Sequence, residues 1–191
     1  MSYASQTTVE NYLGRTLSAS EIASLAYILE SADRTINDRL GGSYGVVDVS
    51  SKYYDGGWRH IEFDSAYEVS AVEMVDSDTS NSVLETYVIG EDLELLPLNQ
   101  TTKNYMVKRY GYFTEGVGNI KITGRFSLGA TVPDDIVYLA TYIASNMLIN
   151  SQLNGIKKEA IEGYSREYTI FNADTDPEIA RVLGSRSEIL I

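Results

Sequence analysis

The sequence contains no cysteine, one histidine, one tryptophan and three prolines. Without cysteine the chain cannot form a disulfide framework, a thiolate zinc site or a cysteine nucleophile. A single histidine cannot by itself build a histidine metal site. No stretch approaches the roughly 20 consecutive apolar residues that a membrane-spanning helix requires. We therefore expect no metal, no cofactor and no membrane contact.

Basic residues are also scarce, with 15 Lys and Arg against 27 Asp and Glu, for a formal net charge of -12. Such a surface repels phosphate backbones, so sequence-specific binding of nucleic acid is not expected. The charge fits first of all a merely soluble acidic protein, and the alternative is a surface past which DNA must move without being held. The N-terminal residues Met1 to Gly14 have neither a basic region nor an apolar run, so no signal peptide is expected there.

Tyrosine, by contrast, is abundant, with 15 residues against 4 Phe. A tyrosine ring is a large, rigid apolar body with a polar tip, which suits protein interfaces and also strands with one wet face. The chain has 191 residues, of which 43% are hydrophobic. That is enough for one core with an inserted subdomain.

The N-terminal region carries two helix signals. A short helix is expected over Thr7–Leu13. A longer helix begins at Ser18 or Ser20, where Glu21 has the spacing of a capping box. It ends at the glycine pair Gly41–Gly42, because glycine adopts the left-handed cap conformation readily. Apolar residues recur in it at spacings of three and four and form one stripe: Ile22, Leu25, Leu29, Ala32, Ile36 and Leu40.

From Val46 to about Leu128 the period of the apolar residues changes to two. Short strands are expected at 59–63, 69–75, 86–89, 93–98, 105–110 and 120–128. Strands of this length with turn residues between them predict an antiparallel sheet or a small barrel. In the first of them His60 is expected on the wet face, opposite Ile61 and Phe63.

At Pro133 the helical pattern returns, with Asp134 and Asp135 in the first turn, where acidic groups complement the helix dipole. This helix runs to about Asn150 and is expected to bury Ile136, Ala140, Ile143 and Met147. A polar extended stretch, 156–171, follows, and Asp176–Pro177 opens a last helix. The sequence thus predicts an α+β fold. Residues 1–45 and 129–191 form a helical module, and residues 46–128 form an inserted antiparallel β-sheet or barrel subdomain.

No catalytic motif stands out along the chain. The pair Gly116-x-Gly118 lacks the third glycine and the following helix of a dinucleotide turn, and no phosphate-binding lysine motif is present. We therefore expect that the protein is not an enzyme. A hydrolase built on two carboxylates remains an alternative, because acidic residues are plentiful.

Three stretches share their order and composition with one known family. The first is Val9-Glu10-Asn11-Tyr12-Leu13-Gly14 with the helix over 20–40. The second is Val132-Pro133-Asp134-Asp135-Ile136 with Ala140, Tyr142 and Ile143 after it. The third is the polar run from Ile156 to Ser165, which ends in Gly163-Tyr164-Ser165 and is followed by the helix that opens at Asp176-Pro177-Glu178-Ile179. In these stretches, roughly half of the sequence, the chain resembles the head–tail connector proteins (adaptors) of tailed bacteriophages, also called head completion proteins.

The resemblance implies a structural subunit of the virion neck, assembled in the host cytoplasm. It would form a homo-oligomeric ring, dodecameric in the family, beneath the portal protein. A stopper or tail-completion protein would bind below the ring, and double-stranded DNA would pass through its channel without specific binding. A stopper or tail-completion protein is itself an alternative identity for the chain.

Two groups of residues are candidate binding sites. The apolar C-terminal segment has no evident partner within the chain, and we expect it to bind the portal through Ile179, Val182, Leu183, Ile189, Leu190 and Ile191. The alternative is that this segment packs on the protein's own core. Interface aromatics are expected at Trp58, Tyr164 and Tyr168. In a different class of function, the β-rich insertion would be an adhesion module in which Trp58 contacts a carbohydrate.

Overall fold

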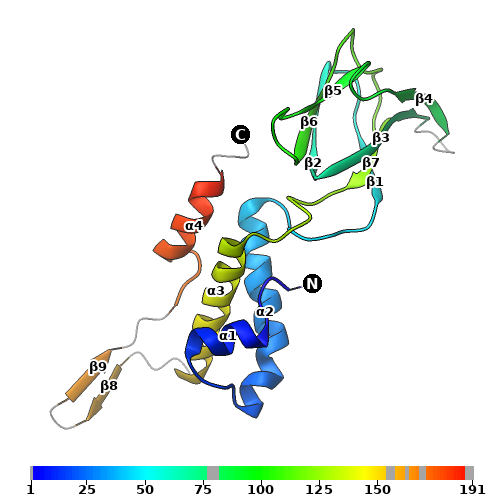
Figure 1. Ribbon diagram of the computed structural model, residues 1–191. Helices are drawn as coiled ribbons and strands as arrows, with labels where there is room; N and C mark the ends of the chain where they lie inside the picture. The colour runs from blue at the N-terminus through cyan, green and yellow to red at the C-terminus, as the bar shows by residue number, and fades with distance from the viewer. Residues whose placement is uncertain (1, 77–81, 154–157, 162–163, 168–170, 188–191) are drawn as a thin grey trace. The chain divides into compact units, whose positions relative to one another are not determined.

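A computed structural model describes residues 2–76, 82–153, 158–161, 164–167 and 171–187. Contacts between residues divide the chain into two compact units (Figure 1). The helical unit combines Met1–Gly41 with Val132–Ile191, and the β unit is Gly42–Thr131. The α+β class is confirmed, with helices at both ends of the chain and antiparallel sheets between them. The sequence placed the divisions at 45/46 and 128/129, and the units divide at 41/42 and 131/132.

The first two helices, α1 (Gln6–Leu13) and α2 (Ala19–Leu40), begin at serine caps. Ser5 caps α1, so the helix begins at Gln6, one residue before the expected start at Thr7, and the Thr8 side chain accepts the N–H of Ser5 in return. The capping box of Ser18 and Glu21 is confirmed at the start of α2. Helix α2 ends at Gly41, whose φ of 67° lies in the left-handed region.

The buried stripe of α2 is confirmed at Leu25, Ala32, Ile36 and Leu40. Two of its expected members were wrong. Ile22 is 45% exposed, and Ile28 is buried in place of Leu29, which is only half-buried. Positions i and i+1 lie about 100° apart on a helix, so spacing alone does not separate the centre of a stripe from its margin.

Helix α3 (Asp134–Leu153) is the central element of the helical unit and contacts α1, α2 and α4 (Pro177–Ser187). Its expected burial is confirmed at Ile136, Ala140 and Ile143, whereas Met147 is half-buried. Leu139, Ala144 and Leu148 of α3 are also fully buried. Between α3 and α4 the backbone forms an antiparallel pair, β8 (Lys158–Ile161) and β9 (Tyr164–Glu167), where only an extended stretch was expected.

The described part of the β unit contains two antiparallel sheets. One has the order β1-β7-β3-β4, with β1 at Ser50–Tyr54, β7 at Ile120–Arg125, β3 at Glu68–Val75 and β4 at Val83–Tyr87. The other has the order β2-β6-β5, with β2 at His60–Ala66, β6 at Lys103–Lys108 and β5 at Leu93–Leu96. Side chains from both sheets, Phe63, Val72, Met106 and Ile122 among them, form one core.

Strand positions follow the sequence expectation except at two places. Strand β1 was not predicted, because both of its serines and Tyr53 are exposed and its sequence has no alternation of apolar and polar residues. Strand β4 was expected at 86–89 and lies at 83–87. Within β2 the expected alternation is confirmed, since His60 is exposed while Ile61 and Phe63 are buried.

Candidate interaction surfaces

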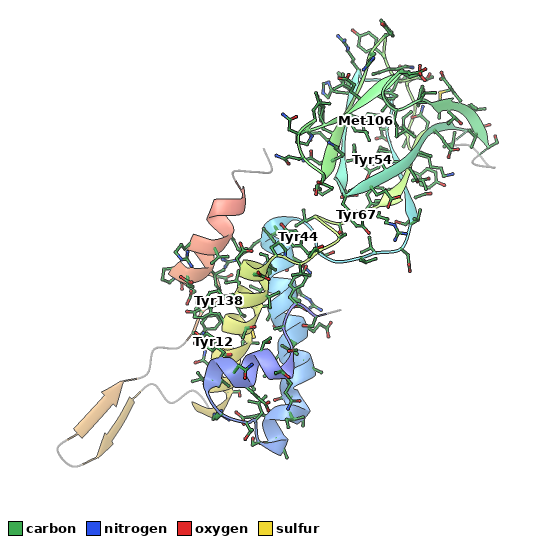
Figure 2. All side chains as sticks on the ribbon, viewed as in Figure 1. Tyr12, Tyr44, Tyr54, Tyr67, Met106 and Tyr138 are labelled. Atoms are coloured by element: carbon green, nitrogen blue, oxygen red, sulfur yellow. The ribbon has the colours of Figure 1, made fainter. Side chains whose placement is uncertain are left out.

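Four aromatic side chains gather on one side of the helical unit. Tyr12 on α1 contacts Tyr138 and Tyr142 on α3, with ring centroids 6.5 and 6.3 Å apart. Phe171, which lies in the chain leading to α4, meets Tyr142 edge-to-face at 6.0 Å. Figure 2 shows Tyr12 and Tyr138 side by side. Pairs of this geometry contribute about 1 kcal/mol each beyond the area that they bury.

Tyr142 is the centre of this tyrosine cluster, defined as Tyr12, Tyr138, Tyr142 and Phe171. Its hydroxyl donates a hydrogen bond of 3.0 Å to the Asp176 carboxylate. Burial, reinforced by this bond to a carboxylate, raises the pKa of Tyr142 to about 12, so the hydroxyl keeps its proton and remains a donor. The other Asp176 oxygen accepts the backbone N–H groups of Glu178 and Ile179 and so caps α4.

Two rings of the tyrosine cluster remain open to solvent, Tyr12 at 45% and Tyr138 at 42% exposure. Each of these two rings contacts another ring of the cluster on one side and faces solvent on the other. Rigid, half-exposed tyrosines bury large area on binding at a small cost in side-chain entropy, which is why they recur in protein interfaces. This face of the helical unit is therefore a candidate protein-binding surface.

The predicted portal-binding residues divide into two groups. Ile179, Val182 and Leu183 lie on α4 and are buried at 6% exposure or less. These three side chains pack on the protein's own core, which was the alternative stated for the C-terminal segment. They do not form an open surface in this structure. Ile189, Leu190 and Ile191 lie outside the described residues.

In the β unit, the loop 55–59 holds Trp58, whose side chain is 66% exposed. The Trp58 carbonyl accepts the N–H of Phe113 at 2.9 Å, and the N–H of Gly57 donates to the Phe113 carbonyl at 3.1 Å. Asp55 accepts the N–H of Gly118 at 2.7 Å. These hydrogen bonds hold the backbone that carries the exposed Trp58 ring.

Gly56 makes this loop possible. Its N–H donates to the side-chain carbonyl of the buried Asn119 at 2.9 Å, and Asn119 in turn donates to the Thr114 carbonyl at 2.9 Å. A Cβ atom on Gly56 would lie 2.0 Å from that Thr114 oxygen. Only a glycine fits so close an approach of two backbone segments.

Next to Trp58 the surface contains an open cavity of about 440 Å³. We call it the Trp58 cavity; its lining residues are Tyr54, Asp55, Trp58, His60, Ile61 and Glu62. The His60 ring stacks on Tyr105 with centroids 5.5 Å apart, which fixes one wall. Burial raises the pKa of Tyr54 to about 12, and its hydroxyl donates to Asp64 at 2.9 Å.

The sequence predicted Trp58 as an interface residue, and its side chain is exposed, but neither the cavity beside Trp58 nor the tyrosine cluster was predicted. The side chains of Tyr164 and Tyr168, the other two expected aromatics, lie outside the described residues. One signal for the cluster was present, because Tyr138 and Tyr142 are four apart and share one face of a helix. The contributions of Tyr12 and Phe171 depend on contacts between segments far apart in the chain, which no local pattern records.

Within the described residues, no group of three or more His, Asp or Glu side chains is placed to hold a metal ion. None of the helices in the described part of the chain combines the length and the apolar character needed to cross a bilayer. Among known proteins, no family model matches the sequence, and a search of curated proteins finds no match either.

Proposed function

We propose that the protein is a non-enzymatic connector subunit of a tailed-phage neck. In this proposal it forms a homo-oligomeric ring beneath the portal, binds a stopper or tail-completion protein on the other side, and lets double-stranded DNA pass through the channel. The basis is the family resemblance of its sequence together with the arrangement of its helical unit.

The observation that carries the proposal is the position of Tyr142. The three stretches that resemble the connector family meet at this residue: Tyr12 belongs to the first, Tyr142 to the second, and Asp176 opens the helix of the third. Tyr12 and Asp176 are 164 positions apart in the sequence, and both contact Tyr142 within the helical unit. Their convergence in one unit supports a shared helical module.

Two further properties fit this role. A formal net charge of -12 would give a ring whose surface repels DNA, which favours passage over adhesion. The half-exposed Tyr12 and Tyr138 offer rigid aromatic contacts for a neighbouring subunit or for the portal.

The test is negative-stain imaging of the protein co-expressed with the portal protein from the same source. We expect a ring stacked coaxially on the portal. Bare portal rings beside a soluble monomer of this chain would overturn the proposal. A Tyr138→Ala variant should weaken ring or portal binding, and Tyr27→Ala, which removes an equally large ring that is 76% exposed on α2, is the matched control.

The role of the C-terminal segment is tested by truncation after Gly184. This removes Ile189, Leu190 and Ile191 but leaves the buried side chains of Ile179, Val182 and Leu183 in place. We expect portal binding to fall while the melting temperature changes little. Undiminished portal binding at an unchanged melting temperature would exclude this segment as the portal contact.

A further inference from the structure

We propose that the Trp58 cavity binds the guanidinium group of an arginine side chain carried by a partner protein. The proposal deepens the proposed function, on which it rests for the partner being a protein. It concerns a part of the chain, the inserted β unit, to which the family resemblance assigns no contact.

The first argument is the charge of the cavity lining. Two carboxylates, Asp55 and Glu62, line it, and no Lys or Arg is among the described residues that line it. Asp55 uses one oxygen for the Gly118 N–H. Within the part of the chain that the structure describes, the Glu62 carboxylate makes no hydrogen bond or ion pair, although the Glu62 backbone pairs with Tyr105 in the sheet. The cavity therefore attracts a cation and leaves carboxylate oxygens to receive it.

Cationic side chains near the cavity do not meet this demand, because they have other partners. Lys52 forms an ion pair with Asp64 at 2.9 Å, and Arg109 forms one with Glu94. Arg59 donates hydrogen bonds to the backbone carbonyls of Lys108 and Arg109 at 3.3 and 3.4 Å. Among the described residues, no Lys or Arg side chain forms an ion pair with Glu62, so its carboxylate is available to a cation from another molecule.

The second argument is the aromatic surface. Tryptophan is the aromatic side chain with the strongest attraction for cations, and the exposed Trp58 ring lines the same cavity as the two carboxylates. The same β unit already uses this interaction internally, since the Lys108 ammonium lies 4.6 Å from the centroid of the Tyr87 ring. In the cavity the exposed Trp58 ring would contact a cation in the same way, and in the proposal a partner protein provides that cation.

Arginine fits this combination better than lysine. Its planar guanidinium can stack on the indole face while its N–H groups donate to a carboxylate at the edge of the ring. Lysine is a compact, strongly hydrated point charge, which loses more hydration on entering an aromatic site. The fixed backbone of residues 55–59 favours binding further, because the site is ordered before the ligand arrives.

Trp58 is the only tryptophan of the chain, so its fluorescence reports on this cavity alone. The experiment titrates the isolated full-length chain with N-acetyl-arginine amide and with its neutral analogue N-acetyl-citrulline amide. We expect a saturable change with arginine, with a dissociation constant on the order of millimolar, and binding of citrulline at least about tenfold weaker. Equal responses to both compounds, or a response to neither, would overturn the proposal.

A disaccharide series distinguishes the carbohydrate-binding alternative. Saturable quenching by a sugar without a response to arginine would overturn the arginine assignment in favour of a sugar platform. The indole N–H resonance of Trp58 in a nitrogen-15 correlation spectrum provides a second readout that does not depend on quenching.

Glu62→Gln is the decisive variant. It should weaken arginine binding about tenfold, and because Glu62 is exposed it should leave the melting temperature unchanged. Glu91→Gln is the matched control, since it removes the same charge from an exposed turn outside the cavity lining. Equal affinities for arginine in the two variants would show that long-range charge, not the cavity, attracts the cation. None of these measurements uses the portal, so their failure would leave the ring experiment unaffected, and the reverse also holds.

Discussion

The helical unit and the β unit position their exposed aromatic residues in different ways. In the helical unit, Tyr12 and Tyr138 stand on helices whose ends are set by neighbouring residues, such as Ser5 for α1. In the β unit, Trp58 stands on a loop held by partners distant in sequence, and the Gly56–Asn119 bond spans 63 positions. The backbone N–H and C=O groups of a helix bond to one another, whereas those of a loop need hydrogen-bond partners from other parts of the fold. The predictions below test whether the two units respond separately to change.

The largest effect is expected from matched deletions in the two cores. Ile143 on α3 and Ile122 on β7 are both fully buried, so replacement of either by Ala should cost about 3 kcal/mol of unfolding free energy. Thermal unfolding can be followed by circular dichroism at 222 nm for the helices and by Trp58 fluorescence for the β unit. Ile143→Ala should lower mainly the first midpoint and Ile122→Ala mainly the second. If both midpoints moved together in both variants, the units would not be energetically separate.

An intermediate effect is expected at two glycines that are needed for different reasons. Ala at Gly56 would bring its Cβ 2.0 Å from the Thr114 carbonyl, and we expect a loss of about 2 kcal/mol with a changed Trp58 emission. Ala at Gly41 would meet nothing within 4 Å and would be strained only by φ of +67°, for a loss of about 1 kcal/mol. Chemical denaturation of both variants checks the order. A smaller loss at Gly56 than at Gly41 would contradict the close approach.

The smallest effect concerns Glu21 and acid. Its hydrogen bonds with Arg15, at 2.6 Å, and with the Ser18 N–H, at 2.7 Å, lower the pKa from 4.5 to about 2 in the folded chain. Because the folded pKa lies below the unfolded one, the stabilisation is full above about pH 4.5 and is lost as the pH falls towards 2.

Replacement of Glu21 by Gln keeps an acceptor for Ser18 and removes the titrating group. The variant should lose about 1 kcal/mol at neutral pH, and the loss should shrink as the pH falls from 4.5 to 2. Urea denaturation across this range measures the difference. A constant difference between the two proteins at every pH would show that the carboxylate does not titrate as proposed.

Much of the fold could be predicted from the sequence, and the exceptions have physical causes. The Ser18 cap, the Gly41 stop and the alternation in β2 are properties of a few adjacent residues. Strand β1 could not be predicted, because its side chains are largely exposed and its strand conformation comes from pairing with β7. Helix α4 was predicted, but its apolar residues suggested a partner protein. Their burial inside the helical unit depends on packing against α2 and α3.

The sequence by itself determined the α+β class, the limits of the long helices and the absence of cysteine chemistry, because each depends on composition or on contacts within a turn or a strand. Only the tertiary structure decided which exposed rings stand together and which carboxylates lie beside them. Tyr12 meets Tyr142 through a contact between α1 and α3, which a local pattern does not relate. Trp58 and Glu62 are only four positions apart, but the fold makes them line one cavity. Those contacts form because many buried side chains together repay the entropy of bringing distant segments into one place.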